Sequence, residues 1–225
     1  MKRLVLVMCG MLVASLANAG RIHFGGIGSG YTIPVVSMKE TRFYSTLRQQ
    51  YDFSCGSAAV ATLLTHQYGI PVNEAAVFQA MYERGDQAKI RREGFSLLDI
   101  KRYLASHGFA ADGFTLSLDK LAEAGLPAIV LINERGYHHF VVIKGMRNDR
   151  VLIGDPATGT RAMDRATFEA IWVNRILFVI HNRKEMARFN LDKDWVAAPQ
   201  APLASSMPRD GLGTLLLPKF GASDF

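Results

Sequence analysis

Cysteine is scarce in this chain, whose 225 residues include only Cys9 and Cys55. Cys9 lies in an N-terminal apolar segment that we expect to be removed, so the mature chain would keep Cys55 alone. A single thiol excludes an internal disulfide and the zinc sites that need several thiolates. A lone cysteine in an exported protein pairs with another chain, lies buried as a small hydrophobe, or takes part in catalysis.

Apolar runs long enough to cross a bilayer, which takes about 20 residues, are missing as well. An apolar run does follow the basic residues Lys2 and Arg3, and it ends at Ala17-Asn18-Ala19. This order of basic, apolar and small residues predicts a signal peptide at residues 1–19, cleaved after Ala19. We therefore expect a periplasmic protein, exported by its signal peptide, with no stable membrane anchor after cleavage.

Motifs for binding nucleotides, metals and nucleic acids are also absent. The chain contains no G-x-x-x-x-G-K-[ST] loop, no H-E-x-x-H and no C-x-x-C. Its net charge of +6 falls to +4 when Lys2 and Arg3 leave with the signal peptide, and the remaining basic residues are mostly scattered. We therefore expect no cofactor, no metal, no ATP-binding domain and no nucleic-acid partner.

The rest of the chain suits one domain with two flanking segments. Residues 20–44 begin with a glycine-rich lead-in that favours no regular element and continue with a short edge strand at residues 33–38. Residues 45–182 carry the periodic patterns of a folded domain. Residues 183–225 hold four of the eight prolines and, from Trp195 onward, show no period, which predicts a C-terminal tail.

Within residues 45–182, helical patterns come first and strand patterns second. The expected helices cover residues 57–68, 73–83, 96–107, 117–124 and 164–172. The expected strands cover residues 127–133, 139–146, 150–154 and 175–181, the first two forming a hairpin. Helices followed by a mainly antiparallel sheet predict an α+β fold.

Cys55 lies where the first of these helices begins, and this favours a catalytic role. Free backbone N–H groups at a helix start stabilise a thiolate, so we expect a lowered pKa for Cys55. Gly56 is expected to let a substrate carbonyl approach the backbone closely. The Cys55 N–H can bind an oxyanion, and a second donor can come from Gln49, which we favour over Gln50.

A catalytic thiol needs a base that is itself held by a third group. His138 and His139 open a strand, and only one of them can face the helix. We favour His139, because Val141 and Ile143 share its face and are expected to point inward. Asp155 ends the next strand, so its carboxylate can accept the ring N–H of His139 and fix the tautomer.

Three sequence blocks together resemble the C39 cysteine peptidases, a branch of the papain-like fold. They are Gln49-x5-Cys55-Gly56-x-Ala58, His139-Phe140-Val141-Val142 and Asp155-Pro156-Ala157-x-Gly159. The resemblance covers residues 45–182 and implies a papain-like domain, with N-terminal helices packed on a C-terminal antiparallel sheet, that acts as a cysteine-type peptidase. Within the family, the run Arg48 to Gly56 is similar to an exported stand-alone branch that serves pseudomonad functional-amyloid systems.

The resemblance also implies a substrate class. Members usually cut leader peptides after Gly-Gly as domains of bacteriocin exporters. Ser54 replaces the Asp common in those members, and no transporter follows in the sequence, so Gly-Gly specificity does not carry over directly. The expected partner is an exported peptide or protein, such as an amyloid component in biofilm formation. Two alternatives remain: a silent peptide-binding module, and a thiol acyl transferase or amidase.

Overall fold

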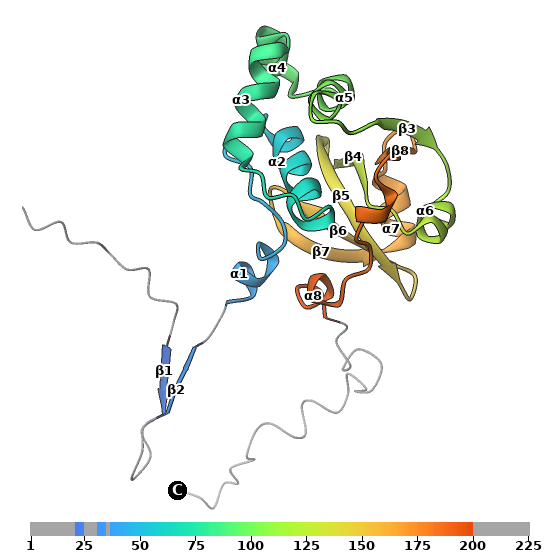
Figure 1. Ribbon diagram of the computed structural model, residues 1–225. Helices are drawn as coiled ribbons and strands as arrows, with labels where there is room; N and C mark the ends of the chain where they lie inside the picture. Colours follow the sequence, from blue (N-terminus) through green and yellow to red (C-terminus); the bar gives the residue numbers. More distant parts are fainter. Residues whose placement is uncertain (1–20, 25–30, 35–36, 200–225) are drawn as a thin grey trace, which may run out of the picture.

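The computed structural model describes residues 21–24, 31–34 and 37–199 (Figure 1). Its helices are α1 (Met38–Arg42), α2 (Cys55–Thr62), α3 (Glu74–Arg84), α4 (Gln87–Glu93), α5 (Leu97–Ser106), α6 (Leu118–Ala124), α7 (Arg165–Ile171) and α8 (Asp192–Trp195), with a π-helical turn η1 (Leu63–Gln67) and a 3-10 turn η2 (Lys184–Met186). Its strands are β1 (Arg21–Phe24), β2 (Tyr31–Pro34), β3 (Ala111–Thr115), β4 (Ala128–Glu134), β5 (Tyr137–Arg147), β6 (Arg150–Asp155), β7 (Gly159–Asp164) and β8 (Ile176–Ile180).

Strands β3 to β8 form one antiparallel sheet in the order β3-β8-β4-β5-β6-β7. Figure 1 shows α2, α3 and α5 on one face of this sheet and α6 and α7 on the other. Each face has its own apolar core, the first built around α2 and the second around α6 and α7. The α+β prediction is confirmed.

Helix α2 lies at the centre of the first core, and all eight of its residues are buried. It is rich in small residues, which let its backbone lie close to the sheet and to α3. Its first residue is Cys55, preceded by Ser54 at the N-cap position. The thiol is therefore at the helix start, as the sequence predicts.

The hairpins of the sheet follow from their turn residues. Arg135 and Gly136 join β4 to β5, and Asn148 and Asp149 join β5 to β6, all four with positive φ. Two-residue turns with this geometry match the twist of antiparallel strands. Because β5 and β6 are antiparallel neighbours, the first residues of β5 and the last residues of β6 lie at the same end of the strands.

The N-terminal segment differs from its prediction. Strands β1 and β2 pair with each other inside the stretch whose glycine content favours no regular element. The strand expected at residues 33–38 agrees with β2 at residues 33 and 34, but it is wrong at its other end, where Ser37 caps α1 and Met38 begins it; residues 35 and 36 lie outside the described residues. Ser37 and Glu40 form a capping box there, and this pattern starts a helix.

The C-terminal prediction of a tail from residue 183 is wrong for residues 183–199. Turn η2 and helix α8 fold back onto the domain, and Asp194 of α8 is fully buried. The backbone N–H of Arg188 donates to the carbonyl of Gln67, 2.8 Å away. Residues 200–225 lie outside the described residues, as does the predicted signal peptide at residues 1–19.

Within the part of the chain that the structure describes, no helix combines the length and apolar character that spanning a bilayer requires.

Candidate active site

Cys55 opens onto a cavity of about 340 Å³. Its side chain is only 7% exposed, and this burial raises the pKa of the thiol. The backbone N–H groups of Phe140 and Gly56 favour the thiolate, but they do not outweigh the loss of water, and the negative charge of Asp155 raises the pKa further. The predicted lowering of the Cys55 pKa is therefore wrong for the resting site, where the thiol is protonated at neutral pH.

His139 and Asp155 form a buried pair beside this cavity. The Nε2 of His139 lies 3.2 Å from Oδ2 of Asp155, and the side chains are 4% and 1% exposed. The other ring nitrogen, Nδ1, is buried with no hydrogen-bond partner among the described residues. His139 lines the same cavity as Cys55, and its Nδ1 is the ring nitrogen not engaged by Asp155.

The choice of His139 over His138 agrees with this geometry. The expectation that Val141 and Ile143 point toward the helix together with His139 is wrong. Helix α2 packs on the face of β5 that carries Phe140 and Val142. Val141 belongs to the core on the opposite face. His139 is the third residue of β5, and there it lines the cavity together with Cys55 and Phe140. His138 also lines the cavity, but it is exposed and has no described carboxylate partner.

Asp155 is held ionised by several donors. Its Oδ1 accepts from the backbone N–H groups of Ala157 at 2.9 Å and Thr158 at 3.3 Å. Its Oδ2 faces His139 and also the guanidinium of Arg161, 3.1 Å away. Burial alone would raise the pKa of Asp155, but His139, the Ala157 N–H and Arg161 together bring it well below its ordinary value.

Arg161 and Glu134 complete the charge arrangement, and sequence reasoning missed both. The guanidinium of Arg161 lies 2.7 Å from Oε2 of Glu134 and so bridges this carboxylate to Asp155. Arg161 belongs to β7, a strand that the sequence pattern did not reveal. Glu134, His139 and Asp155 offer three atoms within 4.8 Å of one another, as a metal site would. The guanidinium of Arg161 lies between the carboxylates of Glu134 and Asp155, so its positive charge offsets their negative charge.

Gln49 lies next to the loop that follows Asp155. Its backbone N–H donates to the carbonyl of Pro156 at 3.1 Å, and its Nε2 donates to the carbonyl of Tyr51 at 3.2 Å. A side-chain amide has two N–H groups, and the bond to Tyr51 uses one of them. Gln49 is half-buried whereas Gln50 is exposed, which agrees with the choice between them.

Tyr137 is a third residue that sequence reasoning missed. Its ring stacks on the His139 imidazole, with centroids 5.1 Å apart, and its hydroxyl donates to the carbonyl of Asp52 at 3.0 Å. The residue stands two positions before His139 on β5, and side chains two apart on a strand share a face. That spacing was the signal that could have found it.

Gly56 allows close packing at the start of α2. A Cβ built on Gly56 would lie 2.9 Å from Cβ of Phe95, closer than real side chains approach. Gly56 therefore makes room for Phe95, which lines the cavity beside Cys55. The apolar side chains of the cavity come from Phe95, Leu97, Leu131, Phe140, Val173 and Ile176.

Comparison with known proteins agrees with this site. Residues 44–184 match the model of the Peptidase C39 family. The chain belongs to this family. It is therefore a cysteine-type peptidase, a hydrolase that acts on peptide or protein substrates. The resemblance to C39 peptidases that the sequence blocks indicate is confirmed.

Two relatives of this C39 peptidase are called "Probable functional amyloid protease FapD". The protein from Pseudomonas fluorescens is 40% identical over 76% of each chain, and that from Pseudomonas aeruginosa is 38% identical over 80% of each chain. The peptidase domain of Streptococcus ComA, a bi-functional ABC transporter, covers 61% of this chain and 98% of its own, with a TM-score of 0.50 at 22% identity, and shows the same fold. A double glycine motif protease from an AMS/PCAT transporter, solved with the leader peptide, gives a TM-score of 0.50 at 25% identity over 60% of this chain and 91% of its own.

Proposed function

We propose that this C39 peptidase works in the periplasm and cuts an exported protein of a functional-amyloid system, in support of biofilm formation. The buried His139–Asp155 pair beside Cys55 carries the catalytic part of the proposal. The two relatives named as functional amyloid proteases support the substrate class. The signal-peptide pattern at residues 1–19 supports the location.

The reaction begins with a proton transfer. Because burial keeps the Cys55 thiol protonated at rest, Nδ1 of His139 takes its proton as the substrate enters. The imidazolium that results is stabilised by Asp155, which stays ionised owing to Arg161 and the Ala157 N–H. Stacking against Tyr137 keeps the imidazole plane fixed during this step.

The thiolate then attacks the scissile carbonyl carbon. A bond forms between Sγ of Cys55 and that carbon, and the negative charge moves to the oxygen, where the Cys55 N–H and the Gln49 amide bind it. The intermediate collapses when the C–N bond breaks and His139 gives its proton to the leaving amine. Water then attacks the thioester with His139 as base, releasing the carboxylic acid and the thiol. The cycle consumes water alone, so we expect no requirement for ATP.

The cavity supports a preference for small residues next to the cut. Phe95 approaches the start of α2 closely because Gly56 has no side chain, and it narrows the space beside Cys55. Glycine or alanine fits such a space, while the apolar walls from Leu131, Phe140 and Ile176 suit hydrophobic side chains farther from the cut.

The experiment has two parts. The termini of exported proteins from wild-type cells and from cells with Cys55→Ala are compared by mass spectrometry, and a peptide library is incubated with purified residues 20–225. We expect one or more exported proteins to lose a processed terminus in Cys55→Ala cells, and library cleavage after Gly-Gly or Gly-Ala pairs. Random cleavage would contradict the specificity. An absence of cleavage by protein whose Cys55 reacts with iodoacetamide would favour an acyl transferase or a binding module.

A further inference from the structure

A second buried charge cluster lies away from the catalytic pair, where the C-terminal segment meets the domain. Lys144 of β5 and Asp194 of α8 are both fully buried, with Nζ and Oδ1 3.2 Å apart. Nε2 of Gln67 donates to the other carboxylate oxygen of Asp194 at 3.0 Å. Burial lowers the pKa of Lys144 to about 8 although Asp194 counteracts it, so the amine remains a cation at neutral pH. Two buried groups of opposite charge stay ionised only when they are paired with each other.

The segment that supplies Asp194 lies beyond the family match, which ends at residue 184. We call residues 185–199 the C-terminal clamp. Its Asn190 accepts from the N–H of Met146 through Oδ1 at 2.8 Å and donates its own N–H to the carbonyl of Lys144 at 2.9 Å. These bonds fall at the β-bulge of β5 between Ile143 and Gly145. The bulge leaves backbone groups without a strand partner, and the clamp satisfies them.

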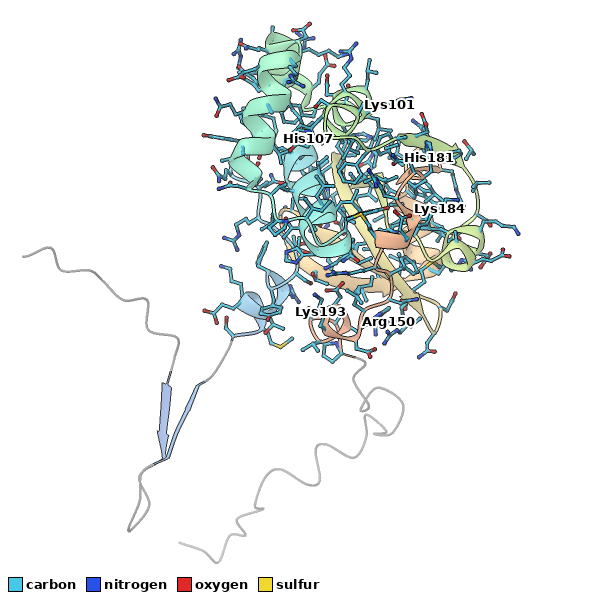
Figure 2. All side chains as sticks on the ribbon, in the orientation of Figure 1. Lys101, His107, Arg150, His181, Lys184 and Lys193 are labelled. Carbon is cyan, nitrogen blue, oxygen red and sulfur yellow. The ribbon has the colours of Figure 1, made fainter. Side chains whose placement is uncertain are left out.

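At its outer end the clamp is tied down by aromatic and charged contacts. The ring of Trp195 lies under the guanidinium groups of Arg147 and Arg150, 5.3 Å and 5.9 Å from its centroid. Figure 2 shows Lys193 and Arg150 at the same end of the molecule, with Lys101 and His181 toward the opposite end. The side chains of Lys144 and Asp194 are both 0% exposed, so these charges are not part of an open surface.

Lys144 connects this cluster to the active-site segment. Its Nζ donates to both the carbonyl and the Oγ of Ser45, each 2.7 Å away. From Ser45 the chain runs to Gln49, held on the way by Thr46 against Thr160 and by the Leu47 N–H on Thr62. Among the described contacts that fix residues 45–49 to the sheet and α2, the Lys144 contact alone carries a formal charge, and charge-assisted hydrogen bonds are roughly twice as strong as neutral ones.

We infer that the C-terminal clamp is a working part of the peptidase, and that Asp194 is a positioning residue that acts through Lys144 and Ser45 to place the amide of Gln49 at the oxyanion. The inference rests on the proposed function, because it takes Gln49 as an oxyanion donor. The family match, which stops before the clamp, gives no role to this segment.

The test compares two reactions of Cys55 in the full mature chain. Hydrolysis of the peptide that the library shows to be cut fastest passes through an oxyanion, whereas alkylation by iodoacetamide does not. Asp194→Asn keeps the side-chain volume and an acceptor for Gln67 but removes the charge. We expect it to lower kcat about tenfold with little change in KM, and to leave the alkylation rate unchanged. Asp192→Asn is the matched control, since Asp192 is on the same helix and its side chain is 93% exposed.

Two further variants separate positioning from folding. In a Gln49→Ala background, Asp194→Asn should lower kcat by less than about twofold, because the group that it places is gone. Lys144→Met with Asp194→Asn removes both charges of this cluster, so the midpoint of thermal unfolding should recover relative to Asp194→Asn alone. The kcat should stay low, because Ser45 has lost its donor. Recovery of kcat together with stability, or full additivity with Gln49→Ala, would overturn the inference. An inactive wild type would instead overturn the proposed function, and the inference with it.

Discussion

The aromatic ring of Tyr137 lies stacked on the imidazole of His139, with an angle of 29° between the two planes. The Tyr137 hydroxyl is bonded to the carbonyl of Asp52, so the ring is fixed at both ends: to the strand that carries the base and to the loop before the nucleophile. The imidazole is thus held by Asp155 at its edge and by Tyr137 on its face.

Removing this ring should therefore loosen the base. We expect Tyr137→Ala to lower kcat about tenfold or more, because a small misplacement of a catalytic group is costly. Tyr137→Phe, which keeps the ring and loses only the hydrogen bond to Asp52, should retain most activity. Steady-state kinetics on the cleaved peptide measures both, with His138→Ala as a control that keeps an intact Tyr137–His139 stack. Equal losses in the Ala and Phe variants would show that the hydroxyl, and not the stack, matters.

The pH dependence of Cys55 alkylation reports its resting state. Because burial raises the thiol pKa, the iodoacetamide rate should stay low at neutral pH and climb only above the ordinary thiol value of about 8.5. A mutant with His139→Ala should show nearly the same profile, since no hydrogen bond joins the two residues at rest in the described structure. A rate that reaches its plateau below pH 7 in the wild type only would establish a preformed thiolate–imidazolium pair.

Asp155 should make stability depend on pH at the acid end. Its pKa in the folded protein lies below the unfolded value of about 3.9, so its ionised form stabilises the fold above that pH. This stabilisation is lost as the pH falls through 3.9 toward the folded-state pKa. Thermal midpoints measured from pH 2 to 7 should fall less steeply below pH 4 for Asp155→Asn than for the wild type. Parallel curves for the two proteins would contradict the assignment, and Asp164→Asn, an exposed aspartate, is the control.

Gln49 and Gln50 offer a matched comparison for the oxyanion site. Loss of one oxyanion donor lowers kcat by about 10²–10³-fold, so Gln49→Ala should be severely slowed yet remain above Cys55→Ala. Gln50 is exposed and its replacement by alanine should have little effect. Single-turnover acylation rates with the cleaved peptide separate this chemical effect from binding. A silent Gln49→Ala with a damaging Gln50→Ala would exchange the two assignments.

Local sequence signals predicted much of the helical part and the central hairpins. Ser96 with Asp99 forms a capping box at the start of the helix expected from residue 96, Asn73 and Ser117 cap their helices, and Gly125 ends α6 with a φ of 62°. These are contacts between residues a few positions apart, and the sequence shows them directly. The same holds for Cys55 at the start of α2, because small residues and a helical period follow it.

What the sequence could not provide depends on residues distant along the chain. Arg161 gains its role only when β7 lies beside β6, and β7 has no clear alternation to reveal it. Lys144 and Asp194 are 50 positions apart, and a lysine in a strand ordinarily indicates a solvent-exposed side chain. The face of β5 that meets α2 was assigned wrongly for a related reason: both faces of this central strand are apolar, so alternation cannot distinguish them.

The layered arrangement has a consequence for when peptidase activity can arise. Cys55 and Gln49 belong to the helical side, whereas His139 and Asp155 belong to the meander of β5 and β6, with 84 positions (139 minus 55) between nucleophile and base. The nucleophile and the base therefore come from different layers. Peptidase activity requires both layers to be packed together, and a chain that has formed one layer alone holds no complete catalytic site.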